Sequence, residues 1–362
     1  MPNELLVDGL RIDELRIPTS MDDPGAGAFA EMVDVRNAIE ADILGSDALA
    51  VGAAELLPFY QLQQYEPKRM FVAMADGRIV GRSILSWSAE PGSTVSWLVG
   101  EVLREYRGRG VGTALFDHLE GLASAAGRTT LQAAAVHTVT PGGERVASQT
   151  GFGDLPAADP GVRFMLRRGY TLQQIKRVSF LDLPVDPGVL AELRGQAQGK
   201  AGDDYRIVEW TGRTPPRWLG DIAVLKGRMS VDEPSGGLDN DDEAWDEGRV
   251  VATDSKLLAG GQLQLTVAVE HRPTGRLAGH SELWLSADRT RPVQQHDTLV
   301  LAEHRGHRLG MLLKVANLQQ LARVNPGSML AYTFNAEENR HMLDVNEAVG
   351  YRPVGAEGAW RR

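Results

Sequence analysis

The feature that most constrains the fold is a strand, a Gly-rich turn and a helix that follow one another once in each half of the chain. In the first half, a strand pattern from Val95 to Leu103 leads into the turn RGRGVGT at 107–113. In the second half, the pattern from Thr298 to Leu301 leads into HRGHRLG at 304–310. Free amides of a first helical turn and missing side chains let a phosphate approach the backbone. The sequence therefore predicts an anion site in each half.

Two familiar phosphate motifs do not fit these turns. No Gly-Lys-Ser or Gly-Lys-Thr follows either turn, so a P-loop is excluded. Thr113 stands where a dinucleotide fingerprint needs its third glycine. The turns therefore indicate a different kind of pyrophosphate site.

The halves also share their order of predicted elements. A chain of 362 residues suits two domains, and alternating apolar patterns predict strands between amphipathic helices in both halves. We expect an α/β fold with domains at 1–184 and 205–362, joined by a Pro-containing linker at 185–204. The predicted strands lie at 10–17, 69–74, 79–87, 95–103, 130–136, 173–183, 206–209, 263–270, 277–285, 298–301 and 329–334. The predicted helices lie at 28–44, 53–64, 111–125, 162–168, 218–228, 309–324 and 337–349, with a helix-prone stretch in the linker.

Composition narrows the classes of function. No apolar run is long enough to span a bilayer and Met1 to Asp13 has no signal-peptide pattern, which predicts a soluble cytoplasmic protein without a membrane partner. With no cysteine, disulfides, Cys-ligated zinc and a thiol nucleophile are excluded. The eight histidines show no metal-ligand spacing, so we expect no metal.

Net charge argues against nucleic acid as a partner. The formal charge of −10 and the pI near 5.4 argue against binding a polyanion by bulk electrostatics, because phosphate contacts need clustered Lys and Arg. One stretch is densely acidic, and it could attract a cationic substrate or simply form a solvated loop with a helix N-cap. Its acidic residues are Asp232, Glu233, Asp239, Asp241, Asp242, Glu243, Asp246 and Glu247.

The first turn resembles the Arg/Gln-x-x-Gly-x-Gly/Ala motif of the GNAT acetyltransferase superfamily, at Arg107, Gly110 and Gly112. The second turn matches at Arg305 and Gly310 but has Arg308 where the first has Gly110. Arg308 could clash with the phosphates or add a charge-assisted contact to them. The sequence leaves both alternatives open.

The resemblance implies two tandem GNAT domains, each a mixed, mostly antiparallel sheet flanked by helices. The tandem arrangement is similar to that of mycothiol synthase and related acyltransferases. The resemblance also implies acetyl-CoA as cosubstrate, its pyrophosphate held by the amides of the turns. The coenzyme-binding residues implied in this way are Val102, Leu103, Arg107, Gly108, Arg109, Gly110, Val111, Gly112, Thr113, Val300, Leu301, Arg305, Gly306, His307, Arg308, Leu309, Gly310, Asn335 and Asn339.

The last two positions belong to a further match in the second half. Asn335 and Asn339 stand where the family's fifth strand leads into a helix, and Asn339 takes the place of an Asn that contacts the coenzyme arm. Helix capping and turn formation are the alternative for both residues. The helix ends before Gly350-Tyr351, and Gly169-Tyr170 is the matching pair in the first half.

One departure from the family bears on activity. Many members carry a Tyr four residues before that glycine, where it protonates the departing thiolate, but here the positions hold Asn346 and Met165. Neither side chain is a useful proton donor. Another group or water must protonate the thiolate, or one or both domains are inactive.

The resemblance also suggests where the reaction takes place. It assigns the amide that polarises the thioester carbonyl to Val102 or Val300, five residues before the motif arginine. Strand alternation then places His296 on the face of Val300, where it could accept the amine's proton near neutral pH. Asp297 is the second candidate for the base, since a β-bulge would change which neighbour faces inward. A solvent-exposed loop His is the structural alternative.

The matching face of the first half carries Leu98 and Ser96, which cannot titrate near neutral pH. We therefore expect coenzyme binding in the first domain and catalysis in the second, with coenzyme also possible there. The expected activity is acetyl-CoA-dependent N-acetylation of a primary amine, that of a small molecule, by direct transfer in a ternary complex. A non-catalytic acyl-CoA-binding or sensing protein is the alternative, and the oligomeric state is open.

Overall fold

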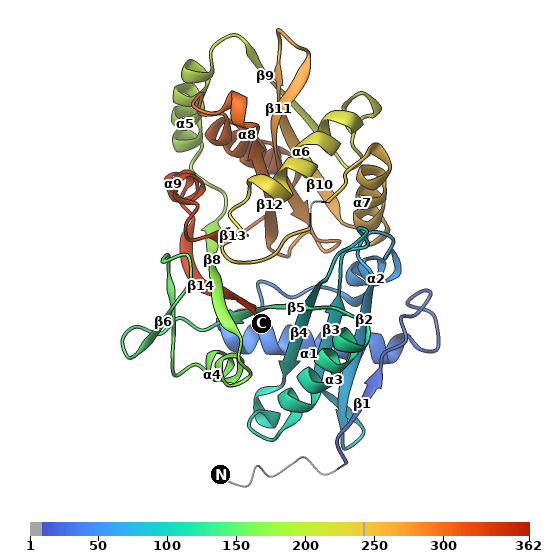
Figure 1. The fold of residues 1–362 in the computed structure, drawn as a ribbon. Helices are drawn as coiled ribbons and strands as arrows, with labels where there is room; N and C mark the ends of the chain where they lie inside the picture. The colour runs from blue at the N-terminus through green and yellow to red at the C-terminus, as the bar shows by residue number, and fades with distance from the viewer. Residues whose placement is uncertain (1–8, 242) are drawn as a thin grey trace. The chain divides into compact units, whose positions relative to one another are not determined.

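The computed structural model describes residues 9–241 and 243–362, and they form two compact units that interleave along the chain (Figure 1). The first unit comprises residues 9–176 together with 235–241 and 355–362. The second comprises 177–234 and 243–354. The expected domains at 1–184 and 205–362 stay a prediction about segments that fold on their own.

The first unit is built on the sheet order β1-β2-β3-β4-β5-β14-β8. Its pairings from β1 to β4 are antiparallel, β4–β5 is parallel, and β5–β14 is antiparallel. The elements are β1 Arg11–Glu14, α1 Ala26–Leu44, α2 Ala53–Gln61, β2 Lys68–Ala75, β3 Arg78–Ser86, β4 Val95–Val102, a 3-10 turn Arg104–Tyr106, α3 Val111–Ala125, β5 Thr130–His137, the small hairpin β6 Arg145–Ala147 and β7 Asp154–Pro156, α4 Pro160–Arg167, and the start of β8 Thr171–Asp182.

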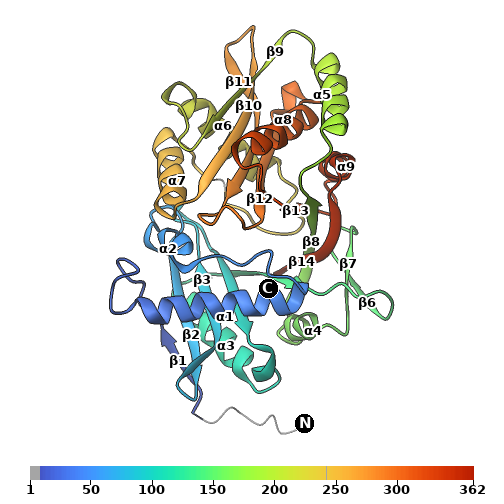
Figure 2. The ribbon, with the colours of Figure 1, turned by 180° about the vertical axis from the view of Figure 1, so that it is seen from behind.

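Helices cover both faces of this sheet. α1 and α2 pack on one face through an apolar cluster that includes Phe29 and Val72, and Figure 2 shows α1 lying across the strands. α3 covers the other face, where Leu115 and Leu119 are fully buried, as Figure 1 shows from the opposite side. α3 begins directly after Gly110, so the Gly-rich turn is fixed at the end of β4.

The second unit repeats this plan with the sheet order β8-β13-β12-β11-β10-β9. Its helices α6 and α7 lie on one face, and α5, α8 and α9 lie on the other. The elements are α5 Pro187–Ala201, β9 Tyr205–Thr211, a 3-10 turn Pro216–Trp218, α6 Leu219–Asp232, α7 Glu247–Ala259, β10 Leu263–His271, β11 Arg276–Leu285, β12 Val293–Val300, a 3-10 turn Ala302–His304, α8 Leu309–Val324, β13 Leu330–Ala336, α9 Arg340–Val349, and the start of β14 Arg352–Arg361.

The structure confirms the duplicated order of elements and the α/β class. It differs from the expected elements in several places, and the strands β6, β7 and β14 lie where no strand was expected. α7 was not expected, because the acidic residues before it hide its apolar stripe; Asp246 caps it by accepting a hydrogen bond from the amide of Arg249 at 2.7 Å. β12 begins at Val293, five residues before the predicted strand, because its first half is polar. Within the described residues, no helix is long and apolar enough to cross a bilayer.

The last strand of the chain completes the sheet of the first unit. Residues 356–361 of β14 pair antiparallel with 132–137 of β5. Trp360 has no exposed surface and packs in the same apolar cluster as Leu155 and Tyr170. The first unit therefore depends on residues that follow the whole of the second unit in the sequence.

Part of the acidic stretch also belongs to the first unit. The side chain of Gln132 on β5 exchanges hydrogen bonds with the backbone of Asp239, at 2.7 and 3.0 Å. Arg361 pairs with the Asp239 carboxylate at 2.6 Å, and the Ser93 hydroxyl donates to Asp241, also at 2.6 Å. These two carboxylates thus have protein partners.

Candidate active site

The first Gly-rich turn has the backbone needed for an anion site. Gly108 and Gly110 adopt φ values of +71° and +79°, the left-handed region that favours glycine. No side chain caps the start of α3, so its first amides are free to bind a ligand. Arg107 turns back and donates from Nε to the Val102 carbonyl at 2.9 Å. Arg107 therefore holds the turn against the end of β4.

The second turn repeats this geometry without the second glycine. Gly306 has φ +84°, and Arg308 takes the left-handed conformation at φ +56°. Arg305 Nε donates to the Val300 carbonyl at 3.1 Å, as Arg107 does to Val102. The Arg308 guanidinium reaches Gln196 of α5 at 3.3 Å. Arg308 therefore keeps the loop conformation at the cost of an unfavourable backbone state.

The strands that carry these turns part from their parallel neighbours. β12 pairs with β13 only through Val293 and Gln294, opposite Ala331 and Tyr332. We call the remainder of the two strands, 295–300 and 333–336, the β12/β13 fork. β4 pairs with β5 through 95–98 and 130–133 only, so the first unit has a similar fork.

The amide of Val300 opens into the β12/β13 fork. Val300 lies opposite Gly279, and the next residue, Leu301, donates to the Ala278 carbonyl at 3.0 Å. Because hydrogen-bonded and non-hydrogen-bonded pairs alternate in an antiparallel ladder, the Val300 N–H points away from β11. The same pattern, with Leu103 bonded to Val80, directs the amide of Val102 away from β3.

A β-bulge sets the side chains of β12. Ser281 lies opposite Thr298 and Leu283 lies opposite Gln295, so two residues of β12 face the single residue between them on β11. Those two residues are His296 and Asp297, and the single residue is Glu282. The bulge turns both side chains to the Glu282 side of the sheet.

The expectation that His296 and Val300 share one face is wrong for this reason. Leu299 packs in the cluster of α6, the helix that also faces His296, while Val300 packs in the cluster of α8. The bulge shifts the alternation by one residue. His296 and Asp297 consequently face α6 together, although regular alternation would allow only one of them.

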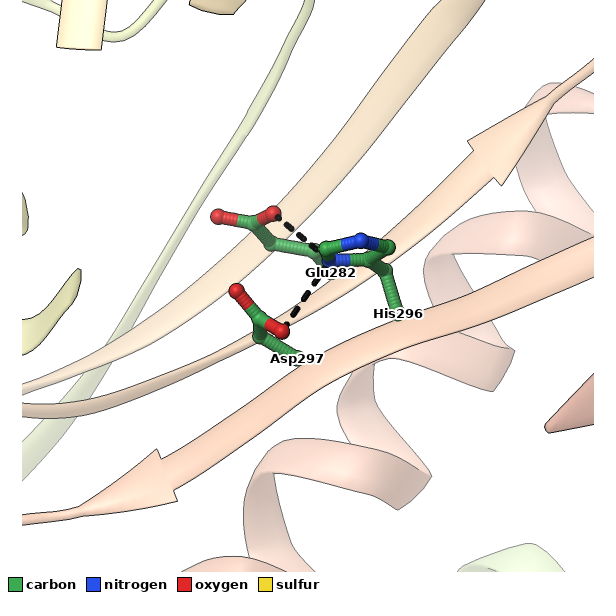
Figure 3. A group of neighbouring side chains, drawn as sticks. All are labelled: Glu282, His296 and Asp297. Carbon is green, nitrogen blue, oxygen red and sulfur yellow. Dashed lines mark ion pairs between the residues drawn. The ribbon is translucent and has the colours of Figure 1, made fainter. Parts of the chain in front are cut away.

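The side chains of Glu282, His296 and Asp297 converge (Figure 3). Nδ1 of His296 lies 3.1 Å from Oδ1 of Asp297 and 3.9 Å from Oε2 of Glu282. Lys226 of α6 reaches between the carboxylates, with Nζ 2.8 Å from Glu282 Oε2 and 3.0 Å from Asp297 Oδ2. The carboxylates of Glu282 and Asp297 thus both contact the Lys226 ammonium, and both face Nδ1 of His296.

The imidazole is the part of this cluster that is most accessible to solvent. The side chain of Glu282 is 1% exposed and that of Lys226 is 7% exposed, whereas that of His296 is 29% exposed. The His296 ring stacks on Trp284, with centroids 3.7 Å apart and planes 10° apart. Since Nδ1 faces the carboxylates, Nε2 is on the opposite ring edge.

The charged states of the cluster support one another. Burial opposes charge on all three flanking groups, but the Lys226 ammonium and neighbouring histidines lower the pKa of Glu282 and of Asp297 below their ordinary values. The two carboxylates in turn raise the pKa of Lys226, against the effect of burial. At neutral pH the three groups therefore carry a net negative charge beside His296.

The same donor atoms are close enough for a cation. One atom each of Glu282, His296 and Asp297 lies within 4.8 Å of the others. The Lys226 ammonium already contacts both carboxylates, so a positive charge is built into the site.

Comparison with known proteins bears on this geometry. Residues 43–152 match the sequence model of the acetyltransferase (GNAT) family. A tandem GNAT protein from the clavulanic acid biosynthesis pathway has a similar structure over 98% of both chains, with a TM-score of 0.72 and 24% identity. The chain therefore has the fold of two GNAT domains in tandem. Acyl transfer is the class of chemistry that these matches support.

Two further solved structures are similar to the tandem GNAT chain. A GCN5-related N-acetyltransferase from Sphaerobacter thermophilus covers 99% of this chain with 96% of its own, at 14% identity and a TM-score of 0.62. A glucosamine N-acetyltransferase region of a fungal multi-domain β-N-acetylglucosaminidase covers 98% of this chain with 38% of its own, at 16% identity and a TM-score of 0.59. No curated protein matches the sequence.

The first GNAT domain carries a different set of groups beside its strand β4. Leu98 and Ser96 are fully buried, and Leu98 belongs to the apolar core. The charged residues nearby are Arg82, which pairs with Glu101 at 2.5 Å, and Glu40 on α1. Within the described residues, the two domains therefore differ in the groups that flank their forks.

The asparagines of the second GNAT domain divide between two roles. The Asn339 side chain accepts a hydrogen bond from the amide of Met342 at 3.2 Å, so it caps α9. Asn335 on β13 accepts hydrogen bonds from Asn346 at 2.6 Å and from the Thr333 hydroxyl at 3.3 Å. Asn335 and its two hydrogen-bond donors lie at the part of β13 that lines the β12/β13 fork.

Sequence reasoning did not find Lys226, Glu282 or Trp284. A signal for two of them exists, because His280, Glu282 and Trp284 alternate along a strand whose other residues are mostly apolar. Polar residues with period two in a buried strand indicate a functional face. Lys226 carries no such signal, since a single lysine in a helix is ordinarily solvated.

Proposed function

We propose that the chain transfers the acetyl group of acetyl-CoA to the primary amine of a small molecule, with catalysis in the second GNAT domain. The observation that carries this proposal is the placement of His296. Its ring is fixed by Trp284 and Asp297 and remains partly exposed. It stands on the strand that ends at the Val300 amide and at the second Gly-rich turn.

In this mechanism His296 acts as the general base. It takes a proton from the incoming amine, and the charges of Asp297 and Glu282 stabilise the imidazolium that forms. The amine attacks the thioester carbonyl, whose oxygen accepts a hydrogen bond from the Val300 N–H. The carbon–sulfur bond then breaks and its electron pair stays on sulfur, while the nitrogen gives its second excess proton to solvent, which leaves a neutral amide and the coenzyme A thiolate.

The coenzyme is held by the Gly-rich turns. In the first domain, the turn at 107–113 binds the pyrophosphate of the coenzyme. Val102 and Leu103, at the end of β4, bind its pantetheine arm. In the second domain the turn at 305–310 does the same, and the αL conformation of Arg308 supports this assignment because it preserves the backbone of Gly110. Each bound pyrophosphate is stabilised by a helix N-terminus.

The charge around His296 favours an amine as the acetyl acceptor. Glu282, Asp297 and Lys226 together carry a net negative charge beside His296, so a protonated amine is attracted before His296 deprotonates it. Asp297 holds the ring rather than acting as the base, because its carboxylate already contacts Lys226 and Nδ1.

A non-catalytic acyl-CoA-binding protein is the second candidate. It is favoured by Met165 and Asn346, which stand where a thiolate-protonating Tyr would be, and Met165 is buried in the apolar core. Such a protein would bind coenzyme and release no thiol.

The experiment is an amine panel with acetyl-CoA, following free thiol release and product mass. Wild type should acetylate at least one amine, and His296→Gln should reduce that rate while binding coenzyme with wild-type affinity. Ser96→Ala, a buried change on β4 of the first domain, is the matched control and should keep the wild-type rate. Tight coenzyme binding with no turnover on any amine would favour the binding protein.

A further inference from the structure

Lys314 on α8 is a buried lysine without a polar partner. It is 1% exposed, and within the described residues it makes no hydrogen bond or ion pair. Its Nζ lies 5.6 Å from the centre of the Tyr351 ring. A buried ammonium without a carboxylate or carbonyl partner is costly, so a structural role does not explain it.

The groups beside Lys314 also have unused polar atoms. The Tyr351 hydroxyl and the Asn346 side-chain oxygen are both buried and have no hydrogen-bond partner in the part of the chain that the structure describes. Tyr351 follows α9 directly and its amide bonds to the Asn346 carbonyl, so the two residues are neighbours at one helix end. Unsatisfied polar atoms gathered in one place indicate a site for a polar ligand atom.

This group lies between the second Gly-rich turn and the β12/β13 fork. α8 begins at the turn, and Lys314 follows Leu309 by five residues, about 7 Å along the helix axis. On the other side, Asn346 donates to Asn335, whose strand β13 forms one arm of the fork. A coenzyme arm that runs from the turn into the fork passes this group.

The group is on the opposite face of the sheet from His296. α8 and Tyr351 belong to the apolar cluster of one face, and α6 belongs to the cluster of the other. In the tetrahedral intermediate, the bonds from the carbonyl carbon to nitrogen and to sulfur point in different directions. A proton acceptor and a proton donor on opposite faces match that requirement.

We propose that Lys314 protonates the coenzyme A thiolate released in the second domain. As the carbon–sulfur bond breaks, the electron pair moves to sulfur and one N–H proton of the Lys314 ammonium moves to it, which yields free coenzyme A and a neutral lysine. The neutral lysine regains a proton from solvent. The inference rests on the proposed acyl transfer, and it supplies the proton donor that Asn346 cannot be.

The chemistry of Lys314 suits this role. Burial lowers its pKa from 10.5 to about 7, so it can lose a proton near neutral pH. The titratable side chain that lies against Lys314 is Tyr351, whose pKa is raised by burial. On the adjoining helices, Arg194 of α5 bonds to Gln319, and Asp344 and Glu347 of α9 pair with Arg340 and Arg177, so these charges are engaged elsewhere.

The test measures the bound thiol itself as well as turnover. Coenzyme A complexes of wild type and Lys314→Met are titrated between pH 5 and 10 by thiolate absorbance, with desulfo-coenzyme A complexes as blanks. The Gly110→Glu background restricts binding to the second domain. The positive charge of Lys314 should hold the thiol pKa at least one unit lower in the lysine protein than in Lys314→Met.

Turnover gives the second readout. Lys314→Met should lower kcat about 10- to 100-fold, the range for loss of a general acid, with less than about a threefold change in coenzyme affinity. Its melting temperature should rise, because a buried charge is replaced by an apolar side chain of similar length. Lys314→Gln is the second variant should the methionine protein fold poorly, and Lys200→Met on exposed α5 surface is the control.

The outcomes separate this inference from the proposed function. If wild type acetylates no amine, the proposed function fails, while the thiol titration still reports on Lys314. Equal thiol titrations in wild type and Lys314→Met would overturn the inference. So would wild-type kcat in a folded Lys314→Met or Lys314→Gln protein.

Discussion

The imidazole of His296 lies flat on the indole of Trp284, with centroids 3.7 Å apart, and turns Nδ1 to Asp297. The stack and the carboxylate fix two different degrees of freedom of the same ring. Trp284 fixes the ring plane, and the Asp297 carboxylate, which approaches Nδ1 to 3.1 Å without a hydrogen bond between them, selects the ring flip that turns Nδ1 toward it. Nε2 is consequently presented in one direction.

Removal of the general base His296 should reduce turnover and leave the affinity for coenzyme unchanged. We expect His296→Gln to lower kcat by about 100-fold, the usual effect of removing a general base. Coenzyme affinity, measured by calorimetry, should change little because His296 contacts neither Gly-rich turn. Wild-type turnover from pH 6 to 9 would remove His296 from the mechanism.

Removal of Lys226 should destabilise the second unit. In Lys226→Met the carboxylates of Glu282 and Asp297 stay buried without their cation, and breaking such a pair costs about 3–5 kcal/mol. The measurement is the free energy of unfolding by urea at pH 7. Adding Glu282→Gln should restore part of the loss, and a double variant no more stable than Lys226→Met would contradict the electrostatic account.

The first Gly-rich turn should be sensitive to one substitution. Gly110 has φ +79°, so Gly110→Glu introduces backbone strain and a negative charge where the pyrophosphate should bind. We expect coenzyme binding at this turn to be lost in calorimetry, while any binding at the second turn remains. Unchanged stoichiometry and affinity would show that the first turn is not a coenzyme site.

Stability of the first unit should depend on pH through Glu40. Burial and Glu101 raise the pKa of Glu40 from 4.5 to about 7, although Arg36 opposes the change. Between those pH values the folded protein binds more protons than the unfolded chain, so stability falls as pH rises from about 4.5 to about 7. Glu40→Gln should remove this fall and add about 1–3 kcal/mol above pH 7. Identical pH dependence of unfolding in both proteins would refute the assignment.

The last strand should matter for the stability of the first unit. Trp360 is fully buried beside Leu155 and Tyr170, and truncating such a side chain to alanine costs about 3–5 kcal/mol. Trp360→Ala should therefore lower the melting transition. Val354→Ala, a change at an exposed side chain of the same strand, is the control and should have little effect. A melting curve of Trp360→Ala that matches wild type would mean that β14 contributes little to the first unit.

The sequence was most informative where structure is local. The order strand, Gly-rich turn, helix was predictable because a left-handed turn and a helix start depend on a few consecutive residues, and Gly108, Gly110 and Gly306 all have positive φ. The family resemblance, the fold class and the duplicated order were correct for the same reason. Arg308 shows the limit, since nothing in its residue type indicates that it adopts the conformation of Gly110.

The features that the sequence did not predict depend on contacts between segments that are far apart in the chain. The bulge at His296 and Asp297 arises from the register between β11 and β12, which the pattern of one strand does not contain. Lys226 joins the site from a helix about 70 residues earlier, brought there only by packing on the sheet. Membership of residues 355–362 in the first unit is likewise a matter of strand pairing, for which the sequence has no local signal.

The pairing of β14 with β5 sets a condition on biosynthesis. While the ribosome is still making the second half, β5 lacks the neighbour that it has in the native sheet, so an edge of the first half stays unpaired. Such an edge can recruit strands of other nascent chains. The first half can therefore complete its sheet only after the second half has been synthesised, and a stop codon before residue 355 would leave the first half, not the second, with an unfinished sheet.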